Sequence, residues 1–179
     1  WDVSNGNSFV QMFYQARAFN QDIGDWDVSN GENFIGMFLY AQSFNQDISN
    51  WDVSGGTLFR NMFHEALAFN QDLGNWDVSS GINFNSMFKD ASSFDQNISY
   101  WTVNNSASLS SMFSDLMVSN QGFSATPTAS EFGKTRITDR SSLDTAITAW
   151  IADEASAIET YGDINTCLLY TSPSPRDTV

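Results

Sequence analysis

The sequence has few of the residues on which most catalytic and metal sites depend. Its 179 residues include one cysteine, Cys167, and one histidine, His64. Disulfides therefore do not hold the fold together, and no cysteine or histidine cluster has the spacing of a zinc site. The many serines lack a histidine partner, and there is no glycine-rich loop for a phosphate. These absences leave no candidate catalytic residue, so the sequence predicts a protein that is not an enzyme and needs no cofactor.

Positive charge is also scarce. Seven Lys and Arg stand against 21 Asp and Glu, which gives a formal net charge of −14. A field of this sign repels phosphate backbones and anionic lipid headgroups, which argues against nucleic acid as a partner. No apolar run reaches the roughly 18 residues that cross a bilayer, and no signal peptide is recognisable. The sequence starts at Trp1, inside a repeat, and we interpret it as a fragment of a longer chain.

What the sequence does contain is a repeat with a constant period. Its first position is tryptophan in five units, without an insertion: Trp1, Trp26, Trp51, Trp76 and Trp101. Valine at the third position, Met-Phe at the twelfth and thirteenth, and glutamine at the twenty-first hold in all five units. Such regularity is typical of a stack of repeats in which no single unit folds alone.

The spacing within a unit predicts one short helix and one short strand. A helix with one buried face is expected where apolar residues recur at i, i+3, i+4 and i+7: Phe34, Met37, Phe38 and Ala41. The spacing of Ile48, Trp51 and Val53 predicts a strand. We therefore expect an α/β solenoid of short parallel strands and short helices, with tryptophan in the core rather than exposed as a platform for sugars or bases.

Two further columns of the repeat predict its turns. Glycine at the sixth position suits a tight turn between strand and helix, and it becomes Ser106 in the fifth unit: Gly6, Gly31, Gly56 and Gly81. Asparagines at the twentieth position, next to the glutamine column, are expected to satisfy loop backbone groups and one another from coil to coil: Asn20, Asn45, Asn70 and Asn120.

The composition changes after the fifth unit. We assign residues 1–125 to the five-repeat solenoid, 126–138 to a linker rich in Thr, Pro, Ser and Gly, and 139–162 to one longer amphipathic α-helix opened by a capping box at Ser141 and Asp144. Residues 163–166 resemble the start of a further repeat. The stretch "CLLYTSPSPRD" from Cys167 resembles a translated sequencing adapter, so we interpret residues 167–179 as an artefact tail.

The columns "FNQDIxxWDVS" and "xMFxxA" resemble the BspA-like leucine-rich-repeat surface proteins of bacteria, over Trp1 to about Ala125. The resemblance implies a right-handed, leucine-rich-repeat-like solenoid that is exported, displayed at the cell surface or secreted, and often adhesive. The chain departs from that pattern at the glycine column, where family members commonly carry an apolar residue.

Aspartates supply the candidate binding residues. One column is expected on the outward strand position, with serines beside it: Asp2, Asp27, Ser29, Asp52, Ser54 and Asp77. Carboxylates about 4.8 Å apart repel by roughly 0.9 kcal/mol per pair even in water, so hydrogen bonds, water or a cation should offset the repulsion. A second row holds weak candidates for calcium: Asp22, Asp47 and Asp72. His64 lies in a variable column and is expected on a solvated rim.

Two functions remain open at this point. One is a binding module whose acidic, hydroxyl-rich face meets a basic or cation-bridged protein or glycan. The other is a structural spacer or stalk in a larger surface protein. The outward strand residues barely change between units, whereas the outer helix column does, which shifts any specific contact toward the helix or loop side: Tyr14, Leu39, His64 and Lys89.

Overall fold

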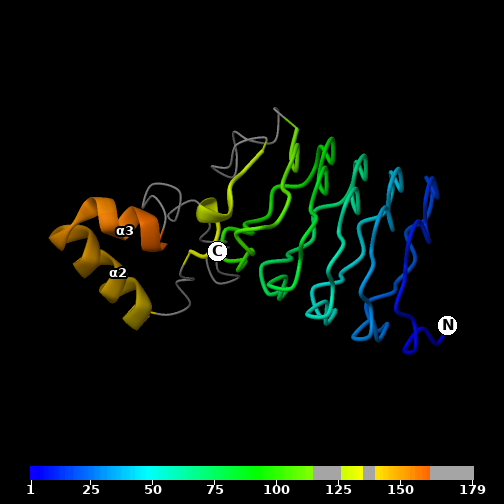
Figure 1. Cartoon of the computed structure of the whole chain (residues 1–179), viewed down its shortest axis with the longest axis horizontal. Coiled ribbons are helices and arrows are strands. Elements are labelled where there is room, and N and C mark those ends of the chain that lie inside the picture. Colours follow the sequence, from blue (N-terminus) through cyan, green and yellow to red (C-terminus); the bar gives the residue numbers. More distant parts are fainter. Residues whose placement is uncertain (115–125, 135–139, 162–179) are drawn as a thin grey trace, which may run out of the picture. The chain divides into compact units, whose positions relative to one another are not determined.

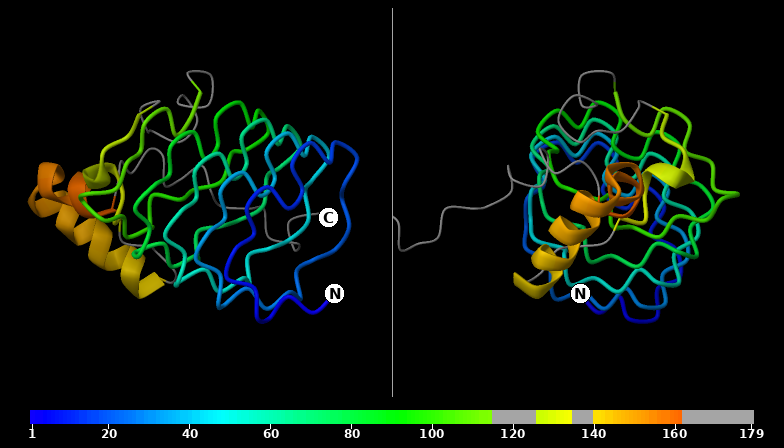
Figure 2. Two further views of the ribbon diagram at one scale, coloured as in Figure 1. Left: turned by 45° about the vertical axis from the view of Figure 1, so that its right-hand side comes forward. Right: turned by 90° about the vertical axis from the view of Figure 1, so that its left-hand side faces the viewer.

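The computed structural model describes residues 1–114, 126–134 and 140–161 (Figure 1). The chain divides into two compact units, Trp1–Gly133 and Lys134–Val179, each of which is described by itself. In the first unit, successive coils of one repeat each lie side by side in chain order (Figure 2). The predicted repeat start at 163–166, the tail at 167–179 and Asn120 lie outside the described residues.

The predicted α/β solenoid of strands and helices is wrong. Among the described residues of the first unit there is no β-strand and no α-helix, and the short 3-10 helix η1 (Ala129–Glu131) lies after the repeats. Pairing of the β type in the described coils is limited to isolated parallel bridges at one position per coil, which join Ser8, Asn33, Leu58, Asn83 and Ser108 in turn. The coils are therefore built from turns.

The predicted helix fails because its backbone hydrogen bonds run between coils. The N–H groups of Phe34, Gly36, Phe38 and Tyr40 donate to carbonyls of the following coil at 2.8 to 3.0 Å. Between them, the N–H groups of Met37 and Leu39 donate three positions back, as Met37 does to Phe34 at 3.2 Å, and the Ile35 N–H donates to the Asn33 side-chain oxygen at 3.1 Å. Two residues in each of the first four coils have positive φ, such as Gly36 (59°) and Tyr40 (62°), and this conformation interrupts a right-handed helix.

The predicted strand is likewise replaced by turns. The N–H of Trp51 donates to the carbonyl of Ile48 at 3.1 Å, and the N–H of Gly56 donates to the carbonyl of Val53 at 2.8 Å. Because these groups bond within the coil, they are not available for a sheet ladder. The apolar residues of both predicted elements are nonetheless buried, since turns of this kind also direct them inward.

Side chains at the same position of consecutive repeats stack on one another to form the core. The ring centroids of Phe38 and Phe63 lie 5.5 Å apart with their planes 5° apart, and Trp51 and Trp76 stack at 6.5 Å. The expected burial of tryptophan is confirmed for Trp51, Trp76 and Trp101, whereas Trp1, in the first coil, is 90% exposed. Each buried indole also donates its Nε1–H to a carbonyl of the preceding coil, as Trp76 does to Ile48 at 3.1 Å.

The predicted amide ladder is confirmed in the described coils. Asn20 accepts a hydrogen bond from the N–H of Asn45 through its side-chain oxygen at 2.9 Å, and Asn45 accepts one from the N–H of Asn70 at 2.8 Å. The Gln46 side chain donates to the Asn20 carbonyl at 3.0 Å, and Gln71 repeats this contact one coil on. The ladder satisfies backbone groups on a face that has no regular secondary structure.

The glycine column is explained by packing rather than by backbone freedom. A Cβ atom at Gly31 would lie 2.5 Å from the Phe34 ring and 2.9 Å from the Val28 carbonyl oxygen, and none of the four glycines of the column has a positive φ. In the fifth unit, where Ser106 and Leu109 replace glycine and phenylalanine, the turn moves one residue along, with Ala107 N–H donating to the Asn104 carbonyl at 2.8 Å.

The residues with positive φ, which is the left-handed region of backbone conformation, allow a prediction about stability. Ser86 has φ 55° while its N–H donates to the Ser110 carbonyl at 3.0 Å, so the position is fixed by its neighbour. Because glycine adopts this conformation without a Cβ penalty, we expect Ser86→Gly to raise the free energy of unfolding by about 0.5–1 kcal/mol. Urea unfolding measures the change, with Ser86→Ala as the control that removes the hydroxyl alone. Equal stability of the two variants would show that the φ carries no penalty.

The described residues after the repeats include three helices. Phe132, which follows η1, is buried with the repeat core, and the N–H of Gly133 donates to the Trp101 carbonyl at 2.9 Å. In the second unit, the single helix predicted over 139–162 is instead two helices that pack together, α2 (Arg140–Ala152) and α3 (Glu154–Tyr161). They are separated at Asp153, whose carboxylate accepts hydrogen bonds from the N–H and hydroxyl of Ser156, as a helix N-cap does.

Candidate functional site

The first acidic column consists of four aspartates on four consecutive coils: Asp2, Asp27, Asp52 and Asp77. All four are exposed, as are Ser29 and Ser54, so the predicted binding residues lie at the surface. Each carboxylate caps a turn by accepting the N–H of the serine two residues on, at 3.1 Å for Ser29 and 3.0 Å for Ser54. The hydroxyls of these two serines donate to the same oxygens at 2.6 and 2.7 Å.

These hydrogen bonds favour the ionised carboxylates. The Ser29 hydroxyl, followed by the Ser29 N–H, lowers the pKa of Asp27, while the charges of Asp2 and Asp52 raise it by a smaller amount. The pKa of Asp52 is lowered in the same way by Ser54. The predicted repulsion along the column is therefore present, and local hydrogen bonds outweigh it. The column is fully anionic at neutral pH.

A pH-dependent stability contribution follows for Asp52. Because its folded pKa lies below the ordinary value of 3.8, its contribution is present above that value and is lost as the pH falls through the lower folded pKa. We expect wild type to exceed Asp52→Asn in urea midpoint at pH 6 and to lose that advantage progressively as the pH falls below 3.8. Comparing the two proteins at each pH cancels the general effect of the net charge. An advantage that grows on acidification would mean that repulsion within the column dominates.

The second acidic column lies five residues before the first: Asp22, Asp47 and Asp72. These carboxylates are also exposed, and they accept the N–H of Gly24, Ser49 and Gly74 at 3.0, 2.9 and 2.8 Å. The Ser49 hydroxyl and N–H lower the pKa of Asp47. Both columns thus have the same local architecture, which is that of a capped turn. The calcium expectation for this column stays a prediction.

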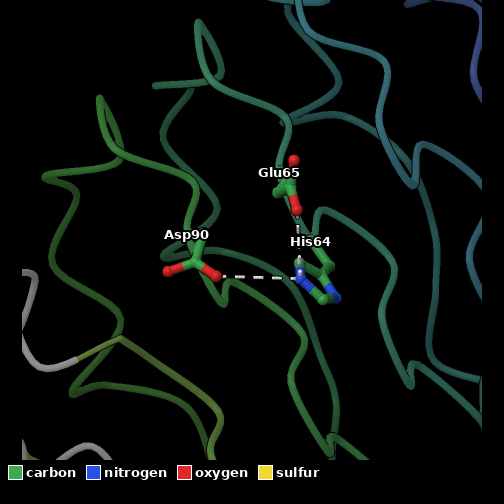
Figure 3. Close-up of side chains that lie close together, drawn as sticks. All are labelled: His64, Glu65 and Asp90. Carbon is green, nitrogen blue, oxygen red and sulfur yellow. Dashed lines mark ion pairs between the residues drawn. The ribbon is translucent and has the colours of Figure 1, made fainter.

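Sequence reasoning missed a third group, which the stacking brings together. His64 Nε2 lies 3.9 Å from Glu65 Oε1 and 3.8 Å from Asp90 Oδ2. Figure 3 shows how the two acids lie about the imidazole. The sequence predicts that His64 lies on a solvated rim, and its side chain is only partly accessible to solvent, at 18% exposed. Burial is the main reason that the pKa of His64 is lowered, against the opposing pull of the two acids. The constant period could have indicated that Glu65 and Asp90 lie close together, because they occupy the same position of consecutive repeats.

The described residues hold no helix that is long and apolar enough to cross a membrane. The charged groups that act on His64 are Glu65, Asp90 and Lys89. The surface of the first unit carries regular rows of fixed negative charge, together with the cluster of His64, Glu65 and Asp90. This arrangement is suited to binding cations or basic groups.

Comparison with protein families matches residues 1–57 and 32–126 to one family, whose description is a Mycoplasma protein of unknown function. Comparison with curated proteins and with solved structures gave no match. The family match supports the prediction that the chain belongs to a family of repeat proteins. It does not confirm the more specific resemblance to BspA-like leucine-rich-repeat proteins. Since the matched residues cover more than half of the sequence, the chain belongs to the DUF285 family.

Proposed function

We propose that the repeat array is a binding module without catalytic activity, displayed at a cell surface or secreted, as in the BspA-like surface proteins whose columns it resembles. The first acidic column is its contact surface, and its partner is a basic segment of a protein or a glycan bridged by a cation. The repeat match to a family of unknown function supports the modular part of this proposal. The charge of the column supports the class of partner.

The observation that carries the proposal is the fixed orientation of the column. Exposed carboxylates on a flexible loop gain little from pairing with a partner, because ordering them costs entropy. Here the Asp27 and Asp52 carboxylates are already held by their serines, above a core in which Phe34 and Phe59 are fully buried. Such a preformed row loses little freedom on binding, which is what a recognition surface requires.

The two acidic columns allow a matched experiment. One variant changes Asp27, Asp52 and Asp77 to Asn, and the other changes Asp22, Asp47 and Asp72 to Asn. Each removes three negative charges from capped turns, and asparagine keeps the side-chain oxygen that accepts the N–H, as Asn97 does for Ser99 at 2.9 Å. Binding of the labelled full chain to cultured animal cells, and to an octalysine peptide, is measured for both variants and for wild type.

We expect the first variant to bind at least tenfold more weakly than wild type and the second to bind nearly as well. Equal losses in both variants would mean that only the net charge matters, and the contact surface would be wrong. Wild type that binds neither the cells nor the peptide would overturn the binding proposal in favour of the spacer.

The spacer is the second candidate function, and the amide ladder favours it. The repeated bonds from Asn45 to Asn20 and from Asn70 to Asn45 tie each coil to the one before, which stiffens the stack along its axis. A stiff array sets a distance between the segments at its two ends. Full activity of a longer surface protein after exchange of the array for an unrelated rigid domain of similar length would support this role.

A further inference from the structure

The cluster of His64, Glu65 and Asp90 has the composition of a metal site. One atom from each residue, an imidazole nitrogen or a carboxylate oxygen, lies within 4.8 Å of the other two. Two ligand atoms bound to one transition metal ion lie roughly 3 Å apart, because each is about 2.0–2.2 Å from the metal. The pairs that include His64 Nε2 are at 3.8 and 3.9 Å, so small side-chain rotations bring them to a common ion.

The backbone holds the three residues in place from two consecutive coils. The N–H of Glu65 donates to the Lys89 carbonyl at 2.9 Å, which fixes it beside Asp90. Both acids have positive φ, 55° and 58°, because they occupy the same position in their coils. The imidazole ring packs against the Tyr40 ring of the preceding coil, with the two ring centroids 5.8 Å apart. A metal at this point would join the third coil to the fourth.

The ligand types distinguish among metals. Calcium and magnesium select oxygen ligands, whereas imidazole nitrogen combined with carboxylate oxygen suits zinc and similar first-row ions. Two carboxylates and one neutral imidazole give a net charge of −2, which a divalent ion balances. Lys89 opposes the ion, since its charge acts on His64. The cluster is distinct from both acidic columns, which contain no nitrogen ligand.

We propose that His64, Glu65 and Asp90 form a binding site for a divalent zinc-class ion, with water completing the coordination. The site goes beyond the binding function proposed above and does not depend on it. It is a weak, surface-accessible site rather than a closed structural one, because Asp90 is 48% exposed and three protein ligands leave open positions.

The test is a titration of the untagged full chain with zinc chloride. Calorimetry and the NMR signals of His64, which is the only histidine in the sequence, monitor the binding. We expect a single site, a shift of the His64 ring nitrogens, and a rise in Tm of about 5 °C at a hundredfold excess of zinc over Kd. His64→Gln, Glu65→Gln and Asp90→Asn should each weaken binding about tenfold or more.

Three controls make the result specific. Cys167→Ser removes the thiol as a competing ligand, and Asp52→Asn removes one negative charge from the first acidic column, so both should bind zinc as wild type does. Lys89→Gln should bind more tightly, because the opposing charge is gone. Zinc binding that survives His64→Gln, calcium binding as tight as zinc binding, or no zinc binding by wild type would each overturn the proposal.

Discussion

Gly56→Ala is expected to lower the free energy of unfolding by about 3 kcal/mol, whereas Gly55→Ala, one residue away in the same turn, changes it by less than about 0.5 kcal/mol. A Cβ at Gly56 would overlap the end of the Phe59 ring and lie 2.9 Å from the Val53 carbonyl oxygen. At Gly55 the nearest atom is the Gly31 carbonyl oxygen at 3.5 Å, which is ordinary contact. Neither glycine has a positive φ, so the pair isolates packing from backbone freedom.

Urea unfolding of the two variants measures the difference, and the fifth unit indicates how to rescue the damaged one. There Ser106 and Leu109 occupy the positions of Gly56 and Phe59, so a side chain at the first position accompanies a smaller one at the second. We expect Phe59→Leu alone to cost about 1 kcal/mol and the double variant to be more stable than the sum of the single effects by at least about 1 kcal/mol. Strictly additive effects would show that the ring is not the obstacle and that the Val53 carbonyl is.

The second large effect is expected at Trp76. Trp76→Ala should cost about 3–5 kcal/mol, because the indole is 4% exposed and lies in a stack between Trp51 and Trp101. Trp1→Ala removes the same side chain from the same position of the repeat, where it is 90% exposed, and should cost less than about 1 kcal/mol. Thermal or urea unfolding of both variants tests the burial of this column. Similar losses at the two positions would contradict it.

Trp76→Phe separates the hydrogen bond of the indole from its volume. Phenylalanine removes the Nε1–H that donates to the Ile48 carbonyl at 3.1 Å, while that carbonyl keeps the Trp51 N–H as a donor, so the loss of one hydrogen bond should cost about 0.5–1.5 kcal/mol. The remaining loss on going from Phe to Ala then reports on packing. A Trp76→Phe variant as stable as wild type would show that water replaces the donor.

The sequence was sufficient to predict the columns, because a constant period places equivalent residues above one another whatever the backbone does between them. Burial of Phe34, Met37, Phe38 and Ala41, the amide ladder and the exposed aspartates all depend on the period alone. The backbone conformation could not be predicted in this way. A helix and a run of alternating turns can both bury residues at i, i+3, i+4 and i+7, and the choice depends on hydrogen bonds to the next coil.

The same distinction applies to the candidate sites. The serine caps of the first acidic column follow from the local order Asp-x-Ser, which favours a capped turn, whereas the repulsion along the column left hydrogen bonds, water and a cation as alternatives. The cluster of His64, Glu65 and Asp90 contains one histidine and no cysteine, so no histidine or cysteine motif in the sequence marks it. Glu65 follows His64 directly in the third coil, whereas Asp90 approaches from the fourth, and which residues of neighbouring coils touch is set by the turn geometry.

The direction of the hydrogen bonds between coils has a consequence for biosynthesis. At four positions in each of the first three coils, as from Phe34 to Tyr40, the amide donors find their acceptors almost one full repeat downstream, in chain that leaves the ribosome later. The newest coil is therefore incomplete until its successor emerges. In the fifth coil the N–H of Ser111 donates instead to the hydroxyl of Thr126 at 2.9 Å. At this one position a residue from outside the repeats thus supplies the acceptor that a following coil supplies elsewhere.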